Sequence, residues 1–274
     1  MSQYEDSYGT GKRLAFICEA IRQIRPGSVL DIGCGVGQVS YPLAKRFPDV
    51  HFHGVDKDEA SIEYARRNHI APNLTFGHEY DPCGQGRDGM IIASEVIEHV
   101  ESPDEFLMSL RRKLMDTGRL VLTLPNGYGP FEWAAVAEAL LKLVGVYALL
   151  RKLKGFIATG KPAAPVDPVT LALSPHINFF SYSAISSLLT QAGFAIERYS
   201  PRTFLCGFGF DQVIRGERLV SWNSKVADQL PPFASSDWMF LARPSQANGE
   251  LRAYRRGFLA KTRRYLYEKQ YGLR

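Results

Sequence analysis

Cysteine is scarce in this chain and its positions are scattered. The 274 residues include four cysteines, at positions 18, 34, 83 and 206, and no two of them form a CxxC pair. This spacing argues against a disulfide framework or a zinc site and indicates reduced thiols in a cytoplasmic protein. Long apolar runs are also lacking, since no stretch reaches the roughly 18 uninterrupted apolar residues of a membrane-spanning helix. The first residues, MSQYEDSYGTGKR, have no apolar core, so we expect no secretion signal.

Most of the chain has almost no net charge, and the positive charge is concentrated near its end. Residues 250–274 contain eight Lys or Arg and two Glu, a local charge of +6. Because the whole chain carries +5, the preceding 249 residues sum to −1. A hydrophobic content of 45% and a charged content of 22% are ordinary for a globular protein. The sequence therefore indicates a near-neutral domain with a basic tail.

Short apolar strands alternate with helices along the chain. Helical spacing over 13–24 ends at the RPG of 25–27, and further helices separate the β-rich runs that follow. Strands are predicted at 28–33, 50–56, 74–80, 89–96 and 119–126. Such alternation is typical of βαβ units on a parallel sheet. After a helix at 183–194, the runs AIERYS and DWMFLARP predict a hairpin-like edge with an irregular segment between its strands.

Three glycines follow the first predicted strand, in LDIGCGVGQVS. Gly33, Gly35 and Gly37 have the spacing GxGxG, not the GxGxxG of a dinucleotide site. Asp31, at the strand end, would repel a pyrophosphate but suits an amino group. Asp56 closes the second strand at the distance expected for an acid that binds ribose hydroxyls. S-adenosylmethionine fits this pattern and NAD fits it poorly; the plainer alternative is a glycine-rich turn whose two acids cap helices.

The order of four motifs resembles the class I S-adenosylmethionine-dependent methyltransferases. The motifs are VLDIGCGVGQVS, GVDKDEASIEYAR, ASEVIEHVESPDEFL and GRLVLTLPN, and the resemblance covers about 10–126 and 176–243. It implies an α/β fold with a doubly wound, Rossmann-like, seven-stranded, mostly parallel sheet. It also implies contacts from the glycine loop to the methionine part, from Asp56 to the ribose, and from the residues after the third strand to the adenine. His78 stands where such families often have an acid.

This resemblance defines a set of candidate cosubstrate-binding residues. Arg13 could hold the methionine carboxylate, as in the ubiquinone-biosynthesis O-methyltransferases, or it is a solvated arginine at a helix start. The full set is Arg13, Asp31, Gly33, Cys34, Gly35, Gly37, Asp56, Lys57, His78, Glu79 and Glu95.

The stretch SEVIEHV, residues 94–100, places two acids and a histidine close together. Glu95, Glu98 and His99 have the spacing i, i+3, i+4, so on a helical turn they share one face. They are expected at the carboxyl end of the fourth strand, where ligands bind in open α/β sheets. One interpretation is a helix start with two acids favoured by the helix dipole. A second makes His99 a general base.

A third interpretation rests on resemblance as well as on spacing. EVIEH with a later histidine is similar to the ubiquinone-pathway O-methyltransferases and to the small-RNA terminal 2′-O-methyltransferases. That resemblance implies a divalent cation, Mg²⁺ or Mn²⁺, held by Glu95, Glu98, His99 and the His176 of SPHINFF. The candidate catalytic residues are then His99, Glu98 and His176.

Two segments extend the predicted domain of residues 1–245. A cap insertion at about 127–175 contains an amphipathic stretch, 131–154, expected to form a lid helix or an interfacial helix that reaches a lipid-linked acceptor. The tail, 246–274, has the pattern of a basic amphipathic helix. It could dock on its own domain, form a dimer, lie on anionic lipid or bind RNA phosphates.

The sequence thus predicts a cytoplasmic enzyme, with peripheral membrane contact left open through the cap and the tail. The expected reaction is O-methylation of a hydroxyl on an aromatic, prenylated or lipid-linked small molecule, with or without a divalent metal. The alternatives are an RNA 2′-O-methyltransferase and a non-catalytic protein that keeps the cosubstrate pocket. Monomer and homodimer are both compatible with the sequence.

Overall fold

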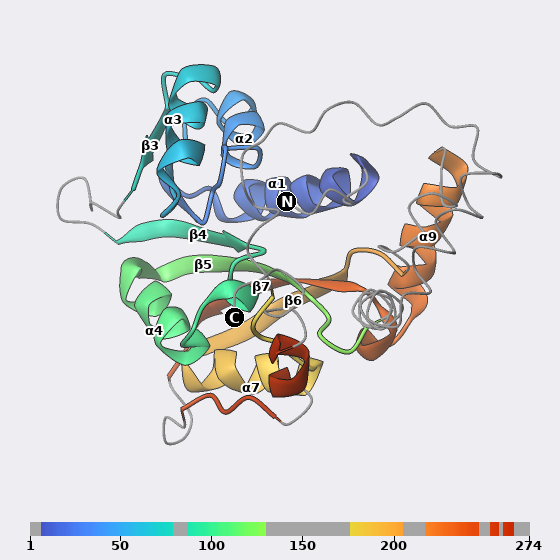
Figure 1. Ribbon diagram of the computed structural model, residues 1–274. Coiled ribbons are helices and arrows are strands. Elements are labelled where there is room, and N and C mark those ends of the chain that lie inside the picture. Colours follow the sequence, from blue (N-terminus) through green and yellow to red (C-terminus); the bar gives the residue numbers. More distant parts are fainter. Residues whose placement is uncertain are drawn as a thin grey trace.

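A seven-stranded mixed sheet organises the molecule (Figure 1). The computed structural model describes residues 7–78, 87–129, 176–204, 217–246, 253–257 and 260–265. The strands are β1 (Ser28–Ile32), β2 (His51–Val55), β3 (Leu74–Gly77), β4 (Asp88–Ser94), β5 (Leu114–Pro125), β6 (Phe194–Pro201) and β7 (Asp237–Pro244). Their order is β3-β2-β1-β4-β5-β7-β6. The pairs among β1 to β5 are parallel, and β7 is antiparallel to both β5 and β6. The predicted doubly wound, mostly parallel sheet and its antiparallel edge are confirmed.

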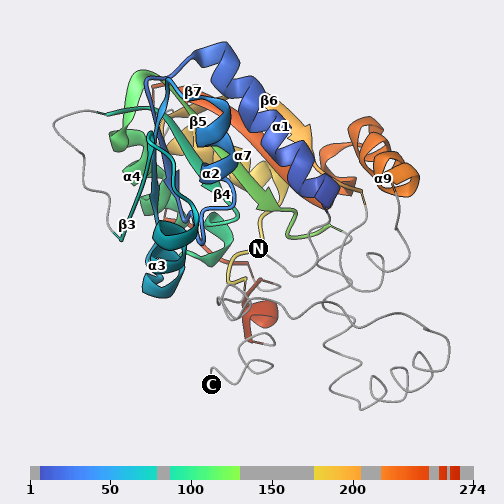
Figure 2. The same ribbon diagram turned by 90° about the horizontal axis from the view of Figure 1, so that it is seen from above.

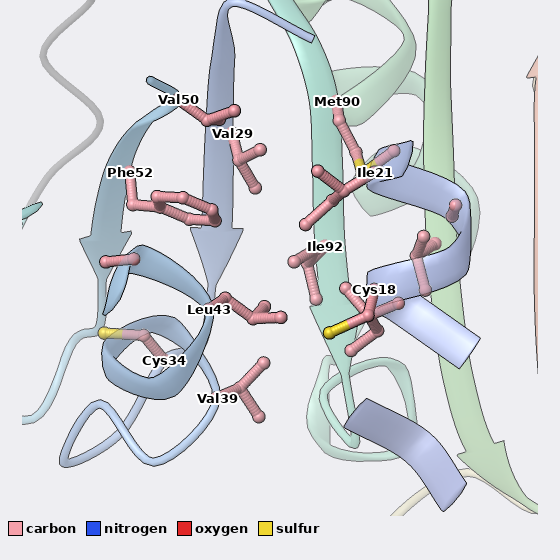
Figure 3. Packing of buried hydrophobic residues seen from close by; sticks show 14 of the residues in the cluster. Cys18, Ile21, Val29, Cys34, Val39, Leu43, Val50, Phe52, Met90 and Ile92 are labelled. Carbon is pink, nitrogen blue, oxygen red and sulfur yellow. The ribbon is translucent and has the colours of Figure 1, made fainter. Parts of the chain in front are cut away.

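Helices cover both faces of the sheet. One face carries α1 (Ser7–Ile24), α2 (Ser40–Arg46) and α3 (Glu59–Asn68), and the other carries α4 (Pro103–Lys113) and α7 (Tyr182–Gln191) (Figure 1). The strand residues alternate between two buried clusters. In β4, Met90 and Ile92 pack in the first cluster, whereas Ile91 and Ala93 pack in the second. Figure 3 shows the first cluster, in which the strand side chains meet those of α1 and α2. A strand buried on both faces is consequently apolar throughout, as the run MIIA is.

The helix α9 (Glu217–Gln229) lies where an irregular segment was predicted, between β6 and β7. Its buried side chains include Asn223, Ser224 and Ala227, whereas Leu219 and Trp222 are exposed. Leu219, Trp222 and Val226 recur at helical spacing, so the sequence did contain a sign of this helix that the prediction overlooked. Figure 2, seen from above, shows α9 beside one end of α1, where Lys12 Nζ lies 2.6 Å from an Asp228 carboxylate oxygen.

Several strand boundaries differ from the prediction, those of β4 and β5 among them. β5 begins at Leu114, five residues early, because Leu114 pairs with Asp88 and the DTG stretch sits within a register shift before Arg119 pairs with Met90. β4 ends at Ser94, two residues early, because Glu95 has a left-handed backbone with φ of 57°.

The predicted additions to the domain are only partly described. Most of the cap insertion, residues 130–175, lies outside the described residues. Within the tail, 253–257 have no regular secondary structure and 260–265 are helical. The prediction of one continuous helix through the tail is therefore wrong. Burial alternates from residue to residue over 253–257, which is the period of an extended chain. Across the part of the chain that the structure covers, every helix is too short or too polar to cross a membrane.

Candidate active site

The glycine loop after β1 is shaped by three left-handed residues. Gly33, Gly35 and Gly37 have φ values of 71°, 52° and 84°, a region that residues with a β-carbon rarely adopt. A β-carbon on Gly33 would overlap the Val96 side chain, and one on Gly37 would lie 2.6 Å from the Phe76 ring. The backbone N–H of Gly33 donates to the Val55 carbonyl at 2.8 Å, which joins the loop to the end of β2. The loop therefore stands at the carboxyl edge of β1 and β2.

Asp56 holds this loop from the end of β2. One carboxylate oxygen accepts the Gly35 N–H at 2.8 Å, and the other accepts the Asp58 N–H at 2.9 Å. The N-cap of α3 is Asp58, which accepts from Ser61, so Asp56 does not cap that helix. Asp56 is half-buried, whereas Lys57 and His78 on the same edge are exposed and Glu79 lies outside the described residues.

Asp31 is buried under the loop, with 2% of its surface exposed. It accepts a hydrogen bond from Ser40 Oγ in the first turn of α2. Burial raises the pKa of Asp31 to about 7, although the Ser40 hydrogen bond and the Arg13 charge oppose the rise. Burial also raises the pKa of the neighbouring Cys34 thiol, so this cysteine stays protonated and packs in the core.

The affinity for a ligand with an ammonium group should therefore depend on pH. An ammonium favours ionised Asp31, so affinity should fall by up to about tenfold per pH unit below pH 7 and level off above it. Calorimetric titrations with S-adenosylmethionine between about pH 5.5 and pH 7.5 measure this. Asp31→Asn should bind weakly with a flat profile over that range, and a profile as steep as that of the unmodified protein would assign the titration to another group.

Arg13 lies inside the protein, with 1% of its surface exposed, so the solvated-arginine interpretation is wrong. Its Nη1 donates to Ser94 Oγ at 3.1 Å, at the carboxyl end of β4. The Ser94 and Thr123 hydroxyls lie 2.9 Å apart. Arg13 thus places positive charge between Asp31 and the SEVIEHV stretch. A role in holding the methionine carboxylate stays a prediction.

Glu95 does not share a helical turn with Glu98 and His99. The short 3₁₀ helix η1 begins after it and covers Ile97–His99. Glu95 Oε1 accepts a hydrogen bond from Thr123 Oγ1 at 2.8 Å and lies 3.4 Å from Arg202 Nη1. Burial alone would raise the pKa of Glu95, but the charges of Arg202 and Arg13 outweigh it, and the pKa is lowered. Glu95 is therefore ionised and held by β5 and by Arg202.

Arg202 ties this arrangement to the antiparallel edge of the sheet. Its Nη2 lies 2.9 Å from an Asp237 carboxylate oxygen, at the start of β7. Thr203 donates to the other Asp237 oxygen at 2.9 Å. Sequence reasoning missed this buried network, because its members are more than 100 residues from Glu95 along the chain and no local spacing connects them.

Glu98, His99 and His176 form a compact cluster. One ligand atom from each lies within 4.8 Å of the others, and the two imidazole ring centres are 5.0 Å apart. Glu98 has 1% of its surface exposed, and among the described residues neither of its carboxylate oxygens has a hydrogen-bond partner. Burial raises the pKa of Glu98 to about 8, with a further contribution from the charge of Glu95. Such a carboxyl group is stabilised by a proton or by a bound cation.

The His176 side of the cluster is positioned by backbone pairing. The N–H groups of Ile177 and Asn178 both donate to the Glu98 carbonyl, at 2.9 and 3.0 Å. The Asn178 side-chain amide donates to the carbonyls of Ile97 and Val100, at 3.1 and 2.6 Å. Asn178, a buried residue among apolar neighbours in SPHINFF, was not selected from the sequence. Of the four predicted metal ligands, the structure brings three together and leaves Glu95 with Thr123 and Arg202.

Comparisons with known proteins place this site in context. A family model described as a methyltransferase domain matches residues 9–199. The ubiquinone biosynthesis O-methyltransferase of Caulobacter vibrioides is 30% identical over 174 residues, which cover 57% of this chain and 67% of that protein. The mitochondrial ubiquinone biosynthesis O-methyltransferase of Schizosaccharomyces pombe is 36% identical over 121 residues, which cover 40% of this chain and 43% of that protein. The match thus spans less than half of the yeast relative.

A solved structure supports the fold. The O-methyltransferase from a trans-AT polyketide synthase multienzyme of Brevibacillus brevis, in complex with S-adenosyl-L-homocysteine, has a TM-score of 0.52 and 14% identity to this chain. The similarity covers 97% of this chain and 78% of that one. At this identity the likeness concerns the arrangement of helices and strands alone.

Proposed function

Since the chain belongs to the class I S-adenosylmethionine-dependent methyltransferases, we propose that it methylates a hydroxyl oxygen on an aromatic, prenylated or lipid-linked small molecule. The observation that carries the proposal is the buried Glu98 carboxyl group beside His99 and His176 at the carboxyl edge of β4. The relatives named as ubiquinone biosynthesis O-methyltransferases support an oxygen acceptor of this class.

Methyl transfer to oxygen needs the acceptor hydroxyl aligned with the methyl group and its proton removed. The acceptor oxygen attacks the methyl carbon, the carbon–sulfur bond breaks, and S-adenosylhomocysteine leaves as a neutral thioether. A hydroxyl is a weak nucleophile until its proton is removed. His99 and His176 supply imidazole nitrogens at the cluster, and His99 is the general base if no cation takes part.

The donor set also fits a divalent cation. Glu98, His99 and His176 offer one carboxylate oxygen and two imidazole nitrogens, and the Glu98 oxygens have no hydrogen bond to give up within the described residues. Because Arg202 holds Glu95, the remaining ligand set has two nitrogens and one oxygen instead of the predicted two of each. This higher share of nitrogen favours Mn²⁺ over Mg²⁺. A cation bound there would lower the pKa of a coordinated acceptor hydroxyl.

The first test concerns the cosubstrate side alone. S-adenosylmethionine and S-adenosylhomocysteine should both bind, and NAD should not. The pyrophosphate of NAD would lie against the glycine loop, and the Asp31 carboxyl group buried beneath that loop would repel it. Calorimetry with all three ligands measures this. Binding of NAD alone would overturn the proposed function, whereas tight cosubstrate binding without turnover on any acceptor pool would favour a non-catalytic protein.

The acceptor itself requires a screen. Purified protein, a labelled methyl donor and pools of hydroxylated aromatics, prenylated phenols and small RNAs should give label in a small-molecule pool. Label in RNA would favour the 2′-O-methyltransferase alternative, as would copurified nucleic acid seen in the ratio of absorbance at 260 and 280 nm.

A further inference from the structure

The segment 176–180, here called the His176 segment, is fixed to the domain at both of its ends. Its first residues pair with the backbone of Glu98, as described above. At its other end, the Gly127 N–H donates to the Phe180 carbonyl at 3.0 Å. A β-carbon on Gly127 would lie 2.5 Å from the backbone of Phe179 and Phe180, so the two chains are in close contact. The His176 segment thus bridges the ends of β4 and β5.

The described tail residues, 253–257 and 260–265, lie against this segment and are here called the C-terminal support. Arg256 Nε donates to Asn178 Oδ1 at 2.9 Å, and Arg256 Nη2 donates to the Glu101 carbonyl at 2.7 Å. The Asn178 amide nitrogen in turn donates to the carbonyls of Ile97 and Val100. One amide side chain therefore connects Arg256 to the turn that carries Glu98 and His99.

Further contacts hold the C-terminal support in place. Arg264 donates to both carboxylate oxygens of Glu101, at 3.0 and 2.9 Å, in the two-pronged geometry that favours arginine. Arg263, with 5% of its surface exposed, donates to the Gly127 carbonyl and lies 5.4 Å from the Phe179 ring centre. The Tyr254 ring packs on Phe180, with ring centres 5.3 Å apart. The support therefore contacts the His176 segment at Asn178, Phe179 and Phe180.

These contacts use three of the five basic side chains in the described part of the tail. Arg256, Arg263 and Arg264 all face the domain, whereas Arg255 and Lys261 are exposed. The ion pairs with Glu101 contribute little stability by themselves, because Glu101 is 66% exposed and well solvated. Their effect is geometric, since they hold the Arg256 side chain that donates to Asn178.

We infer that the C-terminal support positions His176 against Glu98 and His99, with Arg256 as a positioning residue. The geometric part of this inference stands on the contacts above, and its catalytic consequence rests on the proposed function. The support does not supply a ligand itself; it orients residues that do, as groups hydrogen-bonded to metal ligands commonly do. Removing it should leave the cosubstrate loop unchanged, because the described residues of that loop contact β2 and α2 instead.

The experiment compares Arg256→Ala with Arg255→Ala, which removes the same charge from the adjacent exposed position. Nuclear Overhauser contacts between the His99 and His176 rings, in metal-free protein with labelled histidine, report the geometry directly. Arg256→Ala should lose or weaken this contact and should lower Mn²⁺ affinity by about 10- to 100-fold, the usual range for groups that orient metal ligands. Its affinity for S-adenosylmethionine should stay within about twofold, and Arg255→Ala should match the unmodified protein throughout.

Each contrary result has a definite meaning. If Arg256→Ala keeps both the ring contact and the unmodified Mn²⁺ affinity, the inference is overturned. If both arginine variants lower binding to anionic vesicles or RNA equally while the ring contact persists, the tail is a recruitment element and the inference is again overturned. If the unmodified protein shows the ring contact but binds no Mn²⁺, the metal part of the proposed function fails and the geometric inference stands on the ring contact alone.

A second variant covers the case in which Arg256→Ala does not fold. Glu101→Gln changes an exposed residue and removes the charge that holds both Arg256 and Arg264. It should weaken the ring contact in the same direction by a smaller amount. Glu105→Gln is the control, because it makes the same substitution at another exposed glutamate, in the first turn of α4. An unchanged ring contact in folded Glu101→Gln and in folded Arg256→Lys would overturn the inference.

Discussion

Excess chelator should lower methyl transfer by about a hundredfold or more while S-adenosylmethionine binds with unchanged affinity. Loss of the group that activates a hydroxyl costs on the order of 10²–10⁴ in rate. The cosubstrate contacts predicted for Asp31 and Asp56 do not include the Glu98, His99 and His176 cluster, so the donor should still bind. Single-turnover rates before and after chelation, followed by addition of Mn²⁺ or Mg²⁺, measure the effect. Mn²⁺ should restore the rate at lower concentration than Mg²⁺.

Full activity in excess chelator would remove the metal interpretation and leave His99 as the general base. In that case His99→Ala should still cost about 10²–10⁴ in rate. The variant Glu98→Gln tests whether the Glu98 carboxyl group serves catalysis or the stability of the fold. Because Glu98 is buried and its pKa is raised from 4.5 to about 8, its ionised form is costly in the folded protein.

That cost grows as pH rises from about 4.5 to about 8, since over this range the unfolded chain ionises Glu98 and the folded protein does not. Glu98→Gln should therefore melt a few degrees higher than the unmodified protein at pH 8, with little difference at pH 4.5. It should also lose metal binding and turnover. A variant that is less stable at pH 8 would show that Glu98 serves the fold.

Asp56→Ala should weaken the binding of S-adenosylmethionine by roughly 1.5–3 kcal/mol, which is about 10- to 150-fold in Kd. The carboxylate accepts backbone N–H groups from Gly35 and Asp58, and it stands where ribose hydroxyls are expected. The variant thus removes a contact to the ligand and the support of the loop together. Calorimetry gives the total loss.

A ribose-deoxy analogue of S-adenosylhomocysteine separates these two roles. If Asp56 binds the ribose hydroxyls, the unmodified protein should prefer S-adenosylhomocysteine to the analogue, and Asp56→Ala should bind both alike. Equal discrimination in both proteins would show that Asp56 acts only by holding the Gly35 backbone. Glu63→Ala is the control, because Glu63 is an exposed acid on α3 outside the candidate cosubstrate-binding set.

Much of the fold follows from local patterns in the sequence. The alternation of apolar strands with helices predicted the sheet, because strands buried on both faces need apolar side chains throughout, as in Ile91 and Ile92. The helix α9 was not predicted, although Leu219, Trp222 and Val226 recur at helical spacing within it. What the spacing could not show is which face is buried, because Leu219 and Trp222 are exposed whereas Asn223 and Ser224 are buried.

The sequence predicted individual residues of the site better than it predicted the contacts between them. The spacing in SEVIEHV correctly brought Glu98 and His99 together, but it placed Glu95 on the same helical face, and the left-handed backbone at Glu95 prevents this. The partner that holds Glu95 is Arg202, which is 107 residues away in the chain. The contact of Arg256 with Asn178 spans 78 residues. Such pairs are set by the fold, and local spacing carries no information about them.

The close contact of Gly33 with Val96 couples the packing of the two halves of the site. Val96 lies within SEVIEHV, between the residue that Arg202 holds and the turn of Glu98, and its side chain fills the space where a β-carbon on Gly33 would be. Position 33 could therefore gain a side chain only if position 96 became smaller. Even then, the left-handed backbone at Gly33, with φ of 71°, would strain any side chain there, so glycine is required for two separate reasons. A larger side chain at position 96 would likewise press on the glycine loop as well as on the turn that carries Glu98.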